Sequence, residues 1–114
     1  MKTVDEIYNS IATNINSVIK EKWTEAKLNI ETIEEMVSFT GNYSVNNNEK
    51  NQIDVEEFDF HLTFDILELH KITTKDDRNR WNKAIFSLKS DGEFDMQFIW
   101  DQHWHDEIVR LSKE

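Results

Sequence analysis

The 114-residue sequence predicts an α+β fold, a single compact domain with helices packed on one face of an antiparallel sheet, in the order α-β-β-α-β-β-α. Apolar residues recur every three or four positions near both ends of the chain, and they alternate with polar residues in two pairs of segments between those ends. Seven Phe, four Trp and two Tyr supply bulky side chains for one core. A chain of this length is expected to have a radius of gyration near about 13 Å.

The first element is predicted to be a helix from about Thr3 to about Lys20. Thr3 and Glu6 have the spacing of a capping box, in which each side chain binds a backbone N–H of the first turn. One apolar stripe at helical spacing follows: Val4, Ile7, Tyr8, Ile11, Ile15, Val18 and Ile19.

Two strands are predicted after Trp23, because the apolar period changes there from about 3.6 to 2. Ala26, Leu28 and Ile30 define the first strand, a connection lies around residues 32–35, and the second strand holds Val37, Phe39, Gly41 and Tyr43. An antiparallel pair is the simplest arrangement. Residues 46–52 include no apolar side chain, so we expect an exposed loop there, the most flexible part of the chain.

The middle segment is ambiguous between a strand and a helix. Strict alternation of Phe58, Phe60, Leu62, Phe64 and Ile66 with polar residues favours a strand. The box-like pair Asp54 and Glu57, the helical spacing from Phe58 to Leu69 and the length of the apolar run favour a helix. We predict a helix from about Asp54 to about Thr73, and apolar residues on two of its faces predict that it is well buried.

The C-terminal third is predicted to be a β-hairpin followed by a short helix. Ala84, Phe86 and Leu88 share a face of one strand, residues 90–93 form the turn, and Phe94, Met96, Phe98 and Trp100 share a face of the return strand. Trp104, Ile108 and Leu111 then recur at helical spacing, which predicts a short amphipathic helix that could close the open end of the sheet. Trp23, Trp81 and Trp100 are expected in or beside the core.

Charge is the main indication of function. Twenty-three Asp and Glu against thirteen Lys and Arg give a formal net charge of −10, spread over many segments that also carry aromatic residues. Such a surface attracts basic partners and has the wrong sign for binding nucleic acid. The N-terminal residues show no apolar run typical of a signal peptide or a membrane span, so we expect a cytoplasmic protein that binds no membrane.

Residue types that perform chemistry give weak signals. No Cys is present, so thiolate zinc sites and disulfides are excluded. His103, His105 and Asp106, near Asp101, do not have the spacing of a known metal site, and a solvated junction explains them better. His61 and His70 would lie on opposite sides of one helix. Gly41 and Gly92 are too far apart for a phosphate loop, and no nucleophile motif is present. We therefore predict no enzyme activity, no cofactor and no metal.

The return strand and the residues after it are the predicted binding surface. If the aromatic residues of that strand face the core, the residues between them are displayed on the other face. Trp104 fits the core and an exposed aromatic anchor equally well. The predicted surface comprises Glu93, Asp95, Gln97, Asp101, Trp104, Asp106 and Glu107.

Two stretches resemble a known family, the YezG-like immunity proteins. VDEIYNSIATNINSVIKEKWTEAKLNIETIEE is similar to that family's N-terminal helix and first strand, with IY-x-x-IA at residues 7–12 and W-x-x-A at residues 23–26. RWNKAIFSLKSDGEFDMQFIWD is similar to its closing hairpin. The two stretches cover about half of the chain, and the segment between them is shorter and less plainly helical than in the family.

The resemblance implies that residues 1–114 are one immunity-protein-like domain. Members of the family are cytoplasmic antitoxins that neutralise secreted polymorphic toxins, notably nucleases. The expected partner is therefore a basic cognate toxin domain, bound one-to-one, and immunity proteins of contact-dependent growth inhibition are similar in size and charge. Two other hypotheses stay open: a small metal-dependent hydrolase using His103, His105 and Asp101, and an acidic DNA mimic that inhibits a DNA-binding protein.

Overall fold

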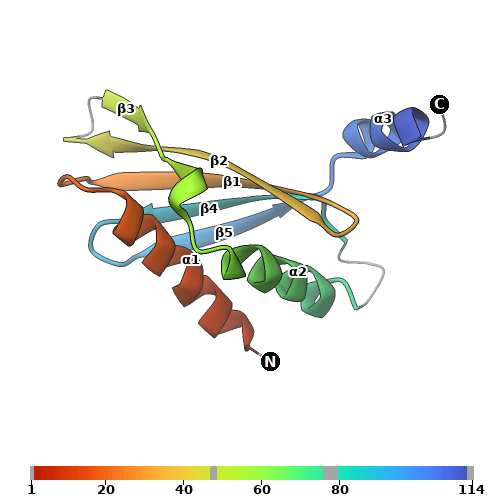
Figure 1. Ribbon diagram of the computed structural model, residues 1–114, viewed down its shortest axis with the longest axis horizontal. Coiled ribbons are helices and arrows are strands. Elements are labelled where there is room, and N and C mark those ends of the chain that lie inside the picture. Colours follow the sequence, from red (N-terminus) through yellow and green to blue (C-terminus); the bar gives the residue numbers. More distant parts are fainter. Residues whose placement is uncertain (1, 47–48, 76–79, 113–114) are drawn as a thin grey trace.

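A five-stranded antiparallel sheet with two helices against one of its faces forms the body of the protein (Figure 1). The computed structural model describes residues 2–46, 49–75 and 80–112. Its elements are α1 (Val4–Val18), β1 (Glu25–Ile33), β2 (Met36–Val45), β3 (Glu49–Gln52), the 3₁₀ helix η1 (Val55–Glu57), α2 (His61–Thr73), β4 (Lys83–Lys89), β5 (Phe94–Ile99) and α3 (Gln102–Ser112). The strand order is β3-β2-β1-β4-β5. The predicted fold class and the order of the main elements are confirmed.

Helix α1 forms as its sequence predicts. The Glu6 N–H donates to the Thr3 hydroxyl at 3.2 Å, and the Thr3 N–H donates to the Glu6 carboxylate at 3.1 Å, so the capping box is complete. Ile7, Ile11 and Ile15 are fully buried against the sheet. The helix is therefore fixed both by its cap and by its apolar stripe.

The central strands bury one face and expose the other. Ala26, Leu28 and Ile30 of β1 are buried on the side of the helices, where Leu28 lies between Gly41 of β2 and Phe86 of β4. A Cβ atom at Gly41 would lie 2.5 Å from a backbone oxygen of β1, so the close approach of the two strands requires glycine. The opposite side, which we call the open face, carries polar residues such as Lys27 and Asn29.

The prediction of an exposed loop at residues 46–52 is wrong in part. Glu49–Gln52 form β3 and pair with β2, with Asn42 opposite Gln52, while residues 47 and 48 lie outside the described residues. An edge strand is held by main-chain bonds, so a strand at a solvated edge needs no apolar side chain. The buried Ile53, whose N–H donates to the Gly41 carbonyl at 2.9 Å, anchors the end of β3.

Helix α2 is shorter than predicted, and the alternative of a strand is wrong. Asp54 makes no capping bond. The chain instead passes through η1, and the helix begins at His61, whose N–H donates to the Asp59 carboxylate at 3.0 Å. Burial is also limited to one side of α2, because a helix lying on a sheet presents only one stripe to it. Phe60 and Phe64 are 70% and 61% exposed, contrary to the prediction of a well-buried segment.

The predicted hairpin is confirmed, whereas the predicted position of the last helix is wrong. The Lys89 N–H donates to the Glu93 carbonyl at 2.8 Å across the turn, in which Gly92 has a φ of 101°. Helix α3 does not close the sheet but projects beyond its end (Figure 1), and none of its residues is buried. Its projection contributes to a radius of gyration of 14.8 Å, somewhat above the expected value. Trp81 is buried, and Trp23 and Trp100 are half-buried, as predicted.

Candidate functional site

The acidic residues of the return strand lie on the open face of the sheet. Asp95 is paired with Ser87, and Gln97 with Ile85, so both side chains point away from the helices. Both are exposed, as is Glu93, which makes a 3.5 Å ion pair with Lys89 across the turn. Because exposed ion pairs contribute little, Glu93 and Asp95 are available to a partner without loss of a structural contact.

Asp101 has a structural position at the junction of β5 and α3. The N–H of Trp104 donates to one carboxylate oxygen at 2.9 Å, which caps α3, and the Lys83 ammonium donates to the other oxygen at 2.9 Å. The backbone N–H and C=O of Asp101 bind the side chain of Asn82 at 2.8 and 3.0 Å. These contacts attach α3 to β4, so Asp101 is not a simple surface charge.

The same contacts shift two pKa values. The pKa of Asp101 is lowered, first by the hydrogen bond from the Trp104 backbone and then by the Lys83 ammonium. The pKa of Lys83 is raised, chiefly by its hydrogen bond to Asp101. Both groups are therefore charged at neutral pH, and the pair holds its geometry there.

A groove of about 260 Å³ separates α3 from the body of the protein and contains three tryptophans. Trp81 precedes β4, Trp100 follows β5, and Trp104 lies on α3. Trp104 is half-buried, and the Lys83 ammonium lies 4.9 Å from its ring centroid. The guanidinium of Arg80 lies 4.3 Å from the ring of Trp100. Trp104 is thus neither a core residue nor fully exposed, but part of the wall of an apolar groove.

The two remaining predicted residues lie on α3. Asp106 accepts a hydrogen bond from Gln102 at 2.8 Å, and Glu107 forms an ion pair with Arg110 at 2.8 Å. Asp106 is exposed and Glu107 is half-buried. The seven predicted residues therefore lie on two neighbouring parts of the chain. The first three lie on β5 or in the turn before it, and the other four lie on α3 or at its N-terminus.

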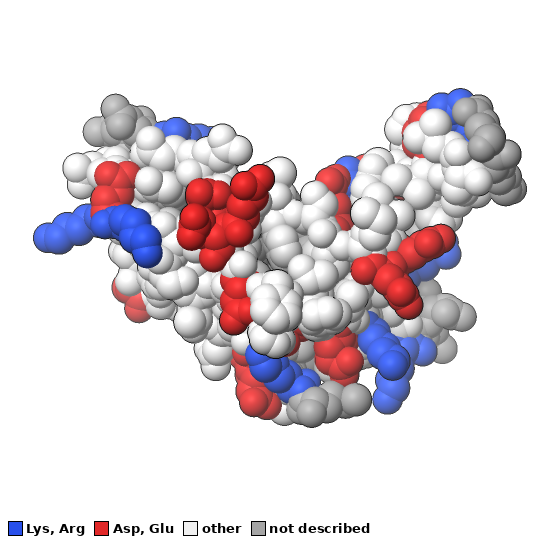
Figure 2. Space-filling model, viewed as in Figure 1, with Lys and Arg blue, Asp and Glu red and all other residues white. Residues whose placement is uncertain are grey.

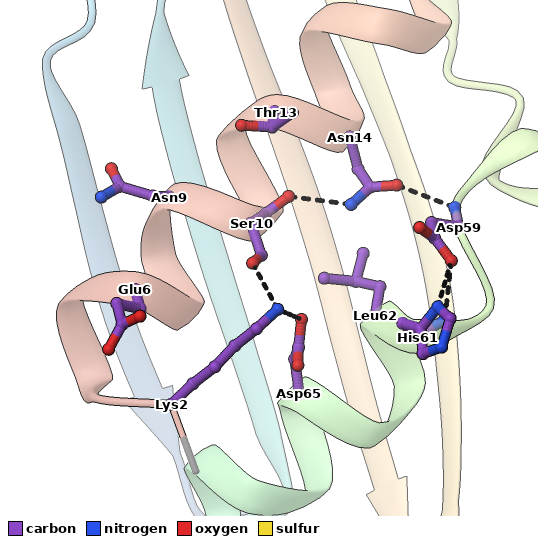
Figure 3. A pocket seen from close by; sticks show the side chains of 10 residues that line it. All are labelled: Lys2, Glu6, Asn9, Ser10, Thr13, Asn14, Asp59, His61, Leu62 and Asp65. Carbon is purple, nitrogen blue, oxygen red and sulfur yellow. Dashed lines mark hydrogen bonds and ion pairs between the residues drawn. The ribbon is translucent and has the colours of Figure 1, made fainter.

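A second groove, of about 370 Å³, lies between α1 and α2 and is shown in Figure 3. Its polar side chains bind one another: Lys2 forms a 2.9 Å ion pair with Asp65, the Asn14 amide oxygen accepts from the Asp59 N–H at 2.8 Å, and Asp59 binds His61 at 2.9 Å. Hydrogen bonds from the backbone N–H of His61 and then from its ring lower the pKa of Asp59. The network fixes α2 on α1, which is sufficient to explain these residues.

A second acidic region surrounds η1. Figure 2 shows Asp and Glu side chains gathered in one compact group where Figure 1 places η1. Its exposed members are Asp54, Glu56 and Glu57. None of the residues that line the tryptophan groove belongs to this region.

The histidines of the C-terminal segment do not form a metal centre. Within the described ranges, no group of three or more His, Cys, Asp or Glu side chains is placed to hold a metal ion. His105 packs against Trp100 with their ring centroids 5.0 Å apart, and Asp101 is occupied by Lys83 and the N-terminus of α3. The arrangement assumed by the hydrolase hypothesis, His103 and His105 with Asp101, does not occur.

Sequence reasoning missed the groove and the contacts that define it. Asn82, Lys83 and Thr73 showed no motif, yet Asn82 and Lys83 attach α3, and the Trp81 indole N–H donates to Thr73 at 2.7 Å. No sequence signal marked Asn82, because its burial, which requires hydrogen-bond partners, is visible only in the structure.

Comparison with known proteins finds a protein family that matches this sequence. A family model described as immunity protein YezG-like matches residues 4–114. None of the curated proteins matches this sequence. In the part of the chain that the structure describes, no helix has the length and apolar character needed to cross a membrane.

Proposed function

We propose, from the premise that this chain belongs to the YezG-like immunity protein family, that it is the cytoplasmic antitoxin of one cognate toxin domain with a basic surface. Membership of an immunity-protein family implies a general role in immunity. The proposal adds that the toxin is a nuclease of a polymorphic or contact-dependent system, that binding is one-to-one, and that the antitoxin itself performs no catalysis.

The observation that carries the proposal is the net charge of −10 together with exposed acids beside an apolar groove. A nuclease must attract phosphates, so its active site is cationic. An acidic protein can occupy such a site in place of the nucleic acid. Apolar contacts then add affinity that charge alone does not provide.

Within the candidate site, we propose that Glu93, Asp95 and Gln97 contact the toxin from the open face of β5, and that Trp104, Asp106 and Glu107 contact it from α3. Asp101 supports this surface by holding α3 in place, since both of its carboxylate oxygens are bound within the chain. A reversal of charge at Asp101 would therefore alter the fold as well as binding.

The direct test mixes the purified chain with the toxin domain encoded beside its gene. We expect a one-to-one complex, loss of nuclease activity, and an association rate that falls by roughly 10 to 1,000-fold as salt is raised, because opposite charges steer the encounter. A salt-independent association rate would remove the electrostatic part of the proposal. An unaffected nuclease would remove the antitoxin assignment for that toxin.

A further inference from the structure

The outer strand β5 has main-chain groups that no other strand uses. The Lys89 N–H binds the Glu93 carbonyl, and in an antiparallel pair the direction of these groups alternates along the strand. Asp95 and Gln97 therefore bond to β4, while the N–H and C=O groups of Phe94, Met96 and Phe98 point away from it. Among residues 2–46, 49–75 and 80–112, no other main-chain partner of these three residues is present.

The two edges of the sheet differ in how they meet solvent. The edge at β3 is short, and its sequence EKNQ is entirely polar. The edge at β5 is longer, and Phe94 and Phe98 are 49% and 37% exposed beside the free main-chain groups. Natural sheets protect such edges with charged side chains, above all Lys, or with Pro or bulges, and β5 has neither Lys nor Pro and a single charged residue, Asp95. An edge with exposed Phe rings and so little protection is suited to receiving another strand.

We infer that the toxin domain adds a β-strand to the free edge of β5, which rests on the proposed antitoxin function. Main-chain bonds to Phe94, Met96 and Phe98 would supply the pairing. The side chains facing these three residues would lie on the side of the helices, beside exposed Phe rings, and are expected to be apolar. The side chains facing Asp95 and Gln97 would lie on the open face and are expected to be basic.

The charges on this chain favour a strand of the toxin, and not a second copy of the chain, as the partner of the β5 edge. Symmetric pairing of two β5 strands about Met96 would place Asp95 opposite Gln97, so neither carboxylate would gain a cation. Each copy also carries a net charge of −10, which opposes self-association. A basic strand, in contrast, gives Asp95 an opposite charge directly across the ladder.

The test replaces Met96 by Pro, which removes an outward N–H without breaking a bond between β5 and β4. The matched control is Gln52→Pro on β3, where the bond from the Ile53 N–H to Gly41 places the N–H of Gln52 at the outer side of the other edge. Both variants leave the net charge unchanged. With the catalytically inactive toxin domain encoded beside the gene as the probe, we expect Met96→Pro to raise the Kd about tenfold or more, and Gln52→Pro to leave it unchanged.

Amide hydrogen exchange of the unmodified chain, free and in the complex, is a second test of the inference. It does not depend on the folding of a variant. The amides of Phe94, Met96 and Phe98 should exchange quickly in the free protein and become protected in the complex, while the amide of Gln52 stays as it was. Unprotected amides at all three positions in a complex that still forms would overturn the inference and leave the antitoxin function standing. A free protein that is a dimer, and becomes a monomer with Met96→Pro, would assign the edge to a second copy. Failure of the parent chain to bind the toxin domain would overturn both the function and the inference.

Discussion

Helices α1 and α3 have similar amphipathic sequences but different surroundings. Helix α1 buries Ile7, Ile11 and Ile15 completely, whereas α3 buries none of its residues and leaves Leu111 57% exposed. The difference follows from the connections: α1 can lie back across the sheet, but α3 begins directly after β5 and points away from it (Figure 1). An amphipathic pattern therefore shows that a helix has an apolar side, but not that its own chain covers that side.

The comparison predicts, first, a large difference in stability between matched Ile substitutions. Ile11→Ala should lower the free energy of unfolding by about 2–5 kcal/mol, because it leaves a cavity in the core. Ile108→Ala, at a half-buried position of α3, should lower it by about 1 kcal/mol or less. Denaturant unfolding measures both. Equal losses would mean that α3 is packed as firmly as α1.

The second prediction concerns the attachment of α3. Asn82→Ala removes the side chain that binds both backbone groups of Asp101, so the free energy of unfolding should fall by about 1–3 kcal/mol. The control is Asn29→Ala, since Asn29 is exposed on the open face of β1 and its loss should change stability by less than about 0.5 kcal/mol. Limited proteolysis should also cut near residue 101 faster in the Asn82 variant. Indistinguishable variants would contradict the attachment described for α3.

A smaller effect is expected from pH. Because the pKa of Asp101 is lowered in the folded state, its contribution is present above the ordinary carboxyl pKa of about 4 and is lost as the pH falls through the lower folded value. The raised pKa of Lys83 acts in the opposite direction, so its contribution is lost only as the pH rises above about 10. NMR signals of the first turn of α3 should shift at acid pH, as should those of the first turn of α1, because the pKa of Glu6 in its capping box is also lowered. A titration of α3 that is the same in Asp101→Asn would assign the effect to another group.

Most of the layered fold could be predicted from the sequence because α1, β1, β2 and the β4–β5 hairpin each have a one-sided pattern. The predictions failed where main-chain bonds or tertiary contacts decide the structure. Strand β3 has no apolar residue, and the start of α2 is set by Asp59 rather than by Asp54. For the site, the exposed positions of Glu93 and Asp95 follow from alternation, but the structural position of Asp101 depends on Asn82 and Lys83, which are distant in sequence.

The two acidic regions of the protein allow the most direct test of the account, whose central claim is that the toxin binds the C-terminal part. One double variant carries Glu93→Lys and Asp95→Lys, and its control carries Asp54→Lys and Glu56→Lys near η1. Both change the net charge equally, so long-range attraction is weakened to a similar degree in each and only the local contacts differ. The Kd for the toxin domain, measured at physiological salt, is the decisive quantity. We predict that the first variant loses about 2–5 kcal/mol of binding free energy beyond any loss in the control. A control variant that loses as much or more would place the toxin at η1 and contradict the account.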